Sequence, residues 1–193
     1  MRPDSAQLIS AGYQEQQRHL HEKTNYGTMA QHYGPLVSQI IEKLEVDHLL
    51  DYGCGRRMGL LKNLNVKRKL TYQGYDPGAG VEELATPPIP AQMVCCIDVL
   101  EHIEPEYLEK VLDHLVELTE VVAFITLHTG PATKTLPDGR NAHLTQEPVE
   151  WWMQKLMYRF DLQTVQKVGE HNYYCILYAR PRIEAPDGTK LVA

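Results

Sequence analysis

Residues 48–59 read HLLDYGCGRRMG, and this stretch decides the fold. An apolar run ends at Asp51, and Gly53 and Gly55 follow before the chain turns toward an expected helix. Glycine at such a turn lets the backbone approach a ligand at the carboxyl end of a strand, because no Cβ blocks the approach. A dinucleotide fingerprint and an ordinary strand-to-helix turn are the alternatives, and a glycine turn alone does not choose among them.

The segments around this turn alternate between strand and helix patterns. We expect strands at 46–51, 69–76, 91–97 and 121–127, and a final hairpin of strands at 161–168 and 172–180 around Gly169. We expect helices within 1–28, from just past Pro35 to 44, over 60–64, and after Pro105 and Pro148. This order predicts an α/β fold with a mostly parallel sheet and an antiparallel last strand. Between 76 and 91 there is room for little more than a turn, so a complete further strand–helix unit is missing there.

Composition places the chain among soluble single-domain proteins. At 193 residues and 43% hydrophobic content it can bury one core, and we expect a single domain over 1–193. No apolar run approaches the roughly 18 residues of a membrane span, and the first ten residues lack the apolar core of an export signal. The four cysteines show no CxxC spacing, and we therefore expect reduced thiols in a cytoplasmic protein.

The net charge of −6 gives no general attraction to nucleic acid. A local basic cluster is nevertheless present: Arg56, Arg57, Lys62, Lys67, Arg68 and Lys69. A solvated face is the default interpretation of this cluster, and contact with a phosphate-bearing substrate is the minority one.

Asp76 ends the second expected strand about 20 residues beyond the glycines, where α/β nucleotide folds place the acceptor for ribose hydroxyls. NAD and S-adenosylmethionine both carry such a ribose. The turn lacks the third glycine of the dinucleotide pattern at its usual offset, which weighs against NAD.

Four motifs in order, LLDYGCG, YDPG, MVCCIDVLEHI and FITLHT, resemble those of class I S-adenosylmethionine-dependent methyltransferases, especially the small type-11-like branch. The resemblance covers residues 46–180 and implies a Rossmann-like sheet with S-adenosylmethionine as cofactor. It implies the following cofactor-binding residues: Asp51, Tyr52, Gly53, Cys54 and Gly55 for the methionine part, Asp76 and Pro77 for the ribose, and Asp98 and Val99 near the sulfonium.

The sequence departs from this family at two points. Arg57 stands where the third glycine of the family usually lies. The third strand, which normally carries the polar residue that reads adenine, is short or missing. We therefore expect unusual adenine contacts.

Three histidines are candidates for catalysis: His102, His128 and His143. A hydroxyl or amine acceptor must lose a proton, and imidazole changes its charge near neutral pH. Each histidine could instead make only a structural hydrogen bond.

A metal-assisted alternative rests on Asp98, Glu101 and His102, spaced D-x-x-E-H, together with His143. This set resembles the metal-binding pattern of the small-RNA 3′-terminal 2′-O-methyltransferases, with Asp98 in place of the family's Glu and without a second clustered His. Carboxylate and imidazole ligands suit Mg²⁺, Mn²⁺ or Zn²⁺. The same D-V-L-E-H segment also occurs in metal-free relatives, so the primary expectation includes no metal.

Trp151 and Trp152 are adjacent on an expected helix, so at most one can face a site. Stacking on a base is one interpretation, and core packing is the favoured one.

The leading hypothesis is a methyltransferase that acts through O- or N-methylation on a small molecule, a nucleotide or a sugar. We expect residues 1–34 to form a lid, 129–147 to form a substrate loop, and 181–193 to form a frayed tail. We expect no membrane partner, and nucleic acid is possible but not favoured as a partner. Metal-assisted modification of RNA and a non-catalytic subunit that binds S-adenosylmethionine remain the alternatives.

Overall fold

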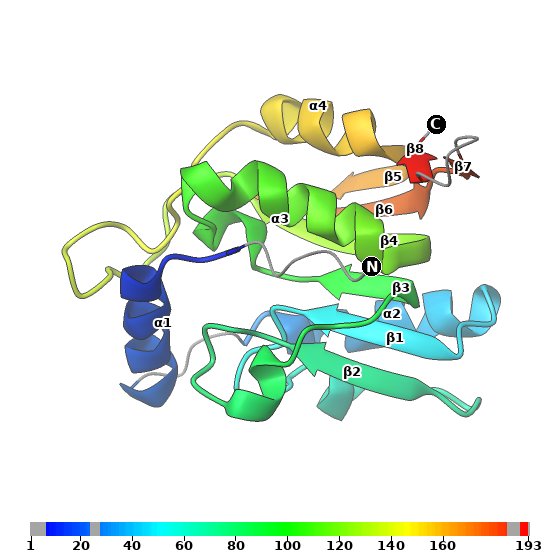
Figure 1. Cartoon of the computed structure of the whole chain (residues 1–193), viewed down its shortest axis with the longest axis horizontal. Helices are drawn as coiled ribbons and strands as arrows, with labels where there is room; N and C mark the ends of the chain where they lie inside the picture. The colour runs from blue at the N-terminus through cyan, green and yellow to red at the C-terminus, as the bar shows by residue number, and fades with distance from the viewer. Residues whose placement is uncertain (1–6, 24–27, 185–189, 193) are drawn as a thin grey trace.

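The computed structural model describes residues 7–23, 28–184 and 190–192 (Figure 1). A six-stranded sheet with the order β2-β1-β3-β4-β6-β5 forms its centre. The strands are β1 (His48–Tyr52), β2 (Thr71–Tyr75), β3 (Ala91–Cys96), β4 (Thr119–His128), β5 (Phe160–Lys167) and β6 (Asn172–Ala179). Strands β1 to β4 are parallel, whereas β6 runs antiparallel to both β4 and β5. The predicted α/β sheet with an antiparallel last strand is confirmed.

The register brings the carboxyl ends of three strands to one edge of the sheet. Tyr52 of β1 pairs with Tyr75 of β2 on one side and with Cys96 of β3 on the other. The segments that leave these strands are therefore neighbours in space, although they lie far apart in sequence. The glycine turn, Asp76 and Asp98 meet at this edge, as open parallel sheets require of their ligand-binding loops.

Helices cover both faces of the sheet. Helix α2 (Ala30–Lys43) covers one face, where Ile41 packs with Leu49 of β1 and Phe124 of β4. Helices α3 (Pro105–Leu118) and α4 (Val149–Arg159) cover the other face, where Leu112 and Trp152 join the core. Helix α1 (Ala11–Lys23) stands across the carboxyl edge of the parallel strands (Figure 1).

The connection between β2 and β3 contains only the short 3₁₀ helix η2 (Glu82–Ala85). Strand β2 is consequently the edge of the sheet, and the short or missing third strand is confirmed.

Two expected helices differ from the structure. Helix α2 begins at Ala30, and Pro35 lies inside it rather than in its first turn. A proline there removes one hydrogen bond, and burial of Ala30 and Gly34 favours the helical turn that precedes it. The expected helix over 60–64 is only the 3₁₀ turn η1 (Leu61–Asn63). Its backbone packs directly on α2. The approach is so close that a Cβ added to Gly34 would lie 2.3 Å from the carbonyl oxygen of Asn63. The space that a longer helix would need is already filled.

The expected frayed tail contains a short ladder instead, in which β7 (Arg182–Glu184) pairs antiparallel with β8 (Lys190–Val192). Backbone groups that would otherwise need water are paired in this ladder. Among the described residues, no helix combines the length and the apolar character that crossing a membrane requires.

All four cysteines are buried: Cys54, Cys95, Cys96 and Cys175. Cys95 and Cys96 are neighbours on β3 and join the cores on opposite faces of the sheet. Burial raises the pKa of each thiol.

Candidate active site

The glycine turn is tied to the end of β2 by its own backbone. The N–H groups of Gly53 and Cys54 both donate to the carbonyl oxygen of Tyr75, at 2.7 and 3.2 Å. Gly53 has φ +77°, and a Cβ there would lie 2.3 Å from a methyl carbon of Val99. The requirement for glycine at 53 therefore comes from the approach of the loop after β3 as well as from backbone conformation.

Asp76 faces the turn from the end of β2. Its carboxylate accepts hydrogen bonds from the backbone N–H groups of Gly55 and Gly78, each at 2.9 Å. Burial raises the pKa of this carboxyl, whereas His21 of α1 lowers it. An acid at the predicted place thus joins the glycine turn, the β2 end and the N-terminal helix.

Asp51 lies beneath the turn. Its side chain is 1% exposed and accepts a hydrogen bond of 2.7 Å from the hydroxyl of Tyr72. Burial raises the pKa of Asp51 to about 7. Sequence reasoning assigned Asp51 to the cofactor surface and missed Tyr72, because the alternation of β2 does not reveal which of its side chains reaches β1.

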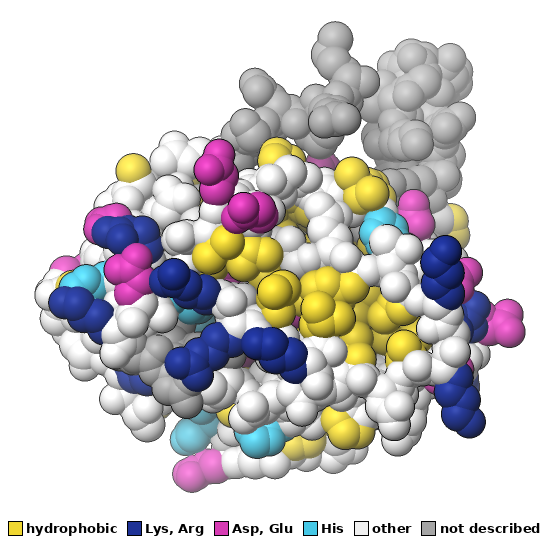
Figure 2. All heavy atoms as spheres, turned by 90° about the horizontal axis from the view of Figure 1, so that it is seen from below, with side chains coloured by type: hydrophobic (Ala, Val, Ile, Leu, Met, Phe, Trp, Pro, Cys, Tyr) yellow, Lys and Arg dark blue, Asp and Glu magenta, His cyan; other side chains and the backbone are white. Residues whose placement is uncertain are grey.

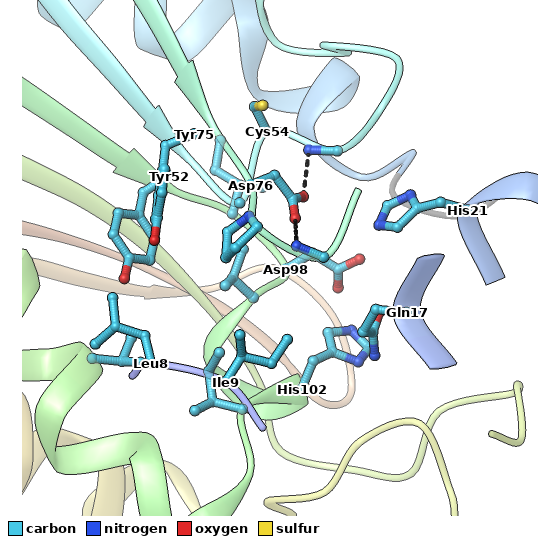
Figure 3. Close-up of a pocket in the computed structure, with 18 of the residues that line it drawn as sticks. Leu8, Ile9, Gln17, His21, Tyr52, Cys54, Tyr75, Asp76, Asp98 and His102 are labelled. Carbon is cyan, nitrogen blue, oxygen red and sulfur yellow. Dashed lines mark hydrogen bonds between the residues drawn. The ribbon is translucent and has the colours of Figure 1, made fainter. Parts of the chain in front are cut away.

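A pocket opens between the ends of β1, β2 and β3 and helix α1. Figure 3 shows the rings of Tyr52 and Tyr75 at one end, His21 at the other, and Asp76 between them. It is lined by every residue predicted for the cofactor except Asp51, namely Tyr52, Gly53, Cys54, Gly55, Asp76, Pro77, Asp98 and Val99.

Helix α1 covers this pocket with one of its faces. Tyr13, Gln17 and His21 are spaced four residues apart, which places them on the same side of the helix, and all three line the pocket. The Tyr13 hydroxyl donates to the carbonyl oxygen of His102 at 2.6 Å, and Gln17 Nε2 donates to that hydroxyl at 2.5 Å. Burial raises the pKa of Tyr13. The spacing of these three residues can be read from the sequence. Because most residues of α1 are polar, however, the sequence does not indicate which face of the helix packs against the protein.

The beginning of α1 is held by a carboxylate. Ser10 Oγ accepts a hydrogen bond of 3.1 Å from the N–H of Tyr13, as a helix N-cap does. Ser10 in turn donates to both carboxylate oxygens of Glu104, from its N–H at 2.9 Å and from its hydroxyl at 2.6 Å. Gln14 donates to the carbonyl oxygen of Pro77, so the helix spans the pocket from one rim to the other. Residues 1–6 and 24–27 of the expected lid lie outside the described residues.

Four residues, Asp98, Glu101, His102 and His143, form what we call the acid–histidine cluster. One ligand atom each from Asp98, His102 and His143 lies within 4.8 Å of the others. The Nδ1 atoms of His102 and His143 lie 2.8 and 2.7 Å from the carbonyl oxygens of Ala142 and Gly130. Each Nδ1 must carry the proton to make that bond, so each Nε2 is the acceptor nitrogen of its ring. The imidazoles are thus oriented in the way that protein metal ligands are.

Burial keeps both imidazoles neutral at neutral pH. It lowers the pKa of His102 to about 3, and it lowers the pKa of His143 as well. The ring of His143 also contacts that of His128, with centroids 4.5 Å apart. Of the three predicted histidines, His102 lines the pocket, while His143 and His128 lie behind it.

Glu101 is the least satisfied side chain of the cluster. It is 1% exposed, and among the described residues neither carboxylate oxygen has a hydrogen-bond partner with good geometry. Burial and the charge of Asp98 raise its pKa, although backbone N–H groups nearby, including that of His128, lower it in part. Asp98 itself has φ +61°, a left-handed conformation that a side chain adopts at a cost of about 1–3 kcal/mol. A buried acid without partners beside a strained acid is typical of a ligand-binding centre.

The tryptophans and Arg68 of the basic cluster lie away from this site, whereas Arg56 and Arg57 border a hollow next to His21. Trp152 is fully buried in the core, and the Trp151 ring packs on it edge-on at 5.0 Å, so core packing is confirmed. Arg68 of the basic cluster pairs with Asp47. Figure 2 shows one face of the molecule, on which Lys and Arg side chains lie among acidic ones. The solvated-face interpretation therefore fits Arg68 best.

No family model matches the sequence, and no curated protein matches it either. Solved structures do match. The methyltransferase domain of bacterial CtHen1-C aligns with a TM-score of 0.57 and 15% identity, over 78% of this chain and 98% of that one. The 1,6-didemethyltoxoflavin-N1-methyltransferase of Burkholderia thailandensis, solved with S-adenosylhomocysteine, aligns with a TM-score of 0.56 and 13% identity, over 87% of this chain and 89% of that one. TnmH aligns with a TM-score of 0.54 and 15% identity over 78% of this chain, and the alignment covers 55% of TnmH. At such identities the comparison shows the fold alone, and that fold is the Rossmann-like fold of class I S-adenosylmethionine-dependent methyltransferases, here without its third strand.

Proposed function

We propose that the protein is an S-adenosylmethionine-dependent methyltransferase. The observation that carries the proposal is the pairing of the glycine turn with Asp76, whose carboxylate bonds the Gly55 N–H in a pocket covered by α1. A carboxylate at the end of the second strand can accept hydrogen bonds from both hydroxyls of a ribose. The residues present therefore fit the nucleoside part of this cofactor.

The bound cofactor would supply a methyl group that is already electrophilic. The protein's part is to hold the acceptor in line with that group, which can contribute about 7–11 kcal/mol to lowering the barrier. In this proposal α1, with Tyr13 and Gln17, excludes water from the pocket. The loop 129–147, whose His143 contacts the ring of His102, forms the acceptor side. Neutral His102 lines the pocket and is placed to accept a proton from a hydroxyl or amine acceptor. His143 and His128 act behind it as positioning residues.

Binding of S-adenosylhomocysteine, followed by isothermal titration calorimetry, tests this proposal. We expect the wild-type protein to bind, and Asp76→Asn to bind at least about tenfold more weakly because a carboxylate–hydroxyl hydrogen bond is worth about 1.5–3 kcal/mol. Asp113→Asn is the matched control, since Asp113 lies on α3 and pairs with Arg159 instead. Absence of binding to the wild-type protein would contradict the proposal. Binding without transfer of a labelled methyl group to any acceptor would favour the non-catalytic subunit.

The acid–histidine cluster favours a second candidate function, metal-assisted methylation of a ribose hydroxyl at an RNA 3′ end. Its donor set fits a divalent cation, because one carboxylate oxygen of Asp98 and one ring nitrogen each of His102 and His143 lie within 4.8 Å of one another, and the buried Glu101 lies next to them. When bound, such an ion would lower the pKa of a coordinated hydroxyl. Asp98, His102 and His143 would hold the ion, and Glu101 would balance its charge.

Metal dependence separates this candidate from metal-free transfer. We expect Mn²⁺ to raise the melting temperature of the wild-type protein, and we expect His143→Ala to abolish that rise while the exposed His32→Ala retains it. Label transfer to a short RNA should require the terminal 2′-hydroxyl and should stop with a 2′-deoxy end. Transfer that is indifferent to both Mn²⁺ and chelator would exclude this second function and leave the first intact.

A further inference from the structure

The side of the pocket next to the edge strand lacks its usual cover. Between β2 and β3 the chain makes only the turn η2, so neither a third strand nor a helix after it stands beside Tyr52 and Tyr75. The space is not left open to solvent, because Tyr52 is 4% and Tyr75 is 7% exposed. The ring of His114 on α3 contacts both tyrosines, with its centroid 5.6 Å from that of Tyr52 and 6.2 Å from that of Tyr75, and so provides part of their cover.

Residues that precede α1 provide part of this cover. Leu8 packs against the core cluster that contains Tyr52, Tyr75 and Val111, and it lines the pocket. Figure 3 shows Leu8 directly beside the two tyrosine rings, at the end of the pocket away from His21. Leu8 therefore adds to the cover that α3 gives these two rings at this end of the pocket.

This end of the pocket is apolar and aromatic. The rings of Tyr52 and Tyr75 lie with centroids 5.1 Å apart, and Ile103 and Val111 line the pocket near Leu8. The Tyr52 hydroxyl is engaged with His114 Nδ1 at 3.1 Å, whereas the Tyr75 hydroxyl makes no hydrogen bond with any other described residue. Apolar walls with one free polar group match the face and the edge of a flat heteroaromatic ring.

The opposite end of the pocket has a different character. His21 borders a shallow hollow that it shares with Glu22, Arg56 and Arg57, and the acid–histidine cluster lies nearby. Charged groups of both signs suit the charged parts of a ligand rather than a neutral base. Asp76 lies between the two ends (Figure 3) and follows Tyr75 directly in the chain, so a ribose bound to Asp76 would have the apolar end on one side and the charged end on the other.

We infer that the apolar end formed by Leu8, Tyr52, Tyr75, Ile103 and Val111 binds the adenine base of the cofactor, with Leu8 of the segment before α1 forming one of its walls. The inference rests on the proposed function, since it places one part of the same ligand. It also assigns a role to residues before α1 that comes from the tertiary arrangement and not from any motif.

Two ligands that differ only in the base test this inference. S-adenosylhomocysteine carries adenine, and S-ribosylhomocysteine has the same ribose and amino acid without it. For Leu8→Ala we expect the dissociation constant of S-adenosylhomocysteine to rise about tenfold, because contact with two or three carbon atoms is lost. The dissociation constant of S-ribosylhomocysteine should stay within about twofold of the wild-type value. Tyr75→Phe, which keeps the ring, should weaken only the adenine-bearing ligand, by about threefold to tenfold.

Two controls separate base contact from closure of the helix. Ser10→Ala removes the hydroxyl's bond to Glu104 and its N-cap bond to the N–H of Tyr13, which help to hold α1, so it should weaken both ligands by similar factors. Ile89→Ala changes an exposed side chain of the β2–β3 connection and should affect neither ligand. If Leu8→Ala weakens both ligands equally, or leaves S-adenosylhomocysteine unchanged, the inference is overturned. Failure of the wild-type protein to bind S-adenosylhomocysteine would instead overturn the proposed function itself.

Discussion

Asp51 couples the stability of the protein to pH. The pKa of its carboxyl group in the folded protein is about 7, because burial penalises the charge, whereas an unfolded chain gives about 3.9. The folded state therefore binds the proton more tightly than the unfolded state. The stability contributed by this group is fully present below pH 4 and is lost as the pH rises through 7.

We predict that Asp51→Asn flattens the pH dependence of the unfolding free energy between pH 4 and pH 8, by on the order of 2–4 kcal/mol. Urea unfolding at both pH values measures the difference from the wild-type protein. Tyr72→Phe is the matched control, since it keeps the carboxyl group and removes the hydrogen bond to its charged form. That variant should be less stable than wild type mainly at pH 8, and an unchanged slope in Asp51→Asn would contradict the prediction.

Glu101 is expected to limit stability in the absence of metal. Because burial and Asp98 raise its pKa, the charged form is unfavourable in the folded state and its cost grows with pH. We predict that Glu101→Gln raises the unfolding free energy at pH 8 in chelator by about 1–3 kcal/mol and removes most of any stabilisation by Mn²⁺. The exposed Glu106→Gln serves as the control for removing one charge. A loss of stability in chelator would mean that the carboxylate is satisfied where it lies.

Two helical glycines have opposite surroundings. A Cβ at Gly34 would lie 2.3 Å from the carbonyl oxygen of Asn63, whereas a Cβ at Gly12 would have no atom within 4 Å. Alanine favours the helix at both positions by about 1 kcal/mol. The two substitutions therefore differ mainly in packing.

We predict that Gly34→Ala lowers the unfolding free energy by about 2 kcal/mol or more, since the backbone of η1 must move away from α2. Gly12→Ala should instead slow hydrogen exchange in α1 by about threefold to fivefold. Thermal unfolding of the first variant and amide exchange of the second are the measurements. Equal effects on stability would show that helix propensity, and not the contact with Asn63, decides the role of Gly34.

At the level of elements, the sequence predicts what is coded locally. The apolar runs of β3 and β4 and the helical period of α3 each identify one element without reference to the rest of the chain. The predicted start of α2 and the predicted length of η1 were wrong, because the two segments pack on each other. Gly34 lets α2 approach Asn63, and no local pattern in either segment records that contact.

Across the whole molecule, the rule for strand ends accounts for the part of the candidate site that could be predicted. Asp76 and Asp98 each follow a parallel strand, so the topology alone brings them to the glycine turn. The contact between Ser10 and Glu104 joins residues 94 positions apart and follows from no strand end, which is why the anchoring of α1 could not be foreseen. The base end of the pocket escaped prediction for the same reason, as it depends on how Leu8 packs against residues far along the chain.

The four buried cysteines should react with a thiol reagent at two different rates. Cys54 lines the pocket under the glycine turn and is 3% exposed, whereas Cys95, Cys96 and Cys175 lie at 0% within the two cores. Cys54 packs in a small cluster with Ala79 and Leu84 beside the glycine turn, so we expect a local opening there to uncover its thiol, whereas the other three become accessible when the sheet separates. We predict that a thiol reagent modifies one cysteine quickly and three slowly, and that S-adenosylhomocysteine slows the fast phase much more than the slow one. Mass spectrometry of partly modified protein identifies the fast site, and a Cys54→Ser variant should lose that phase. The unmodified native protein can therefore report opening of its pocket and loss of its core in a single time course.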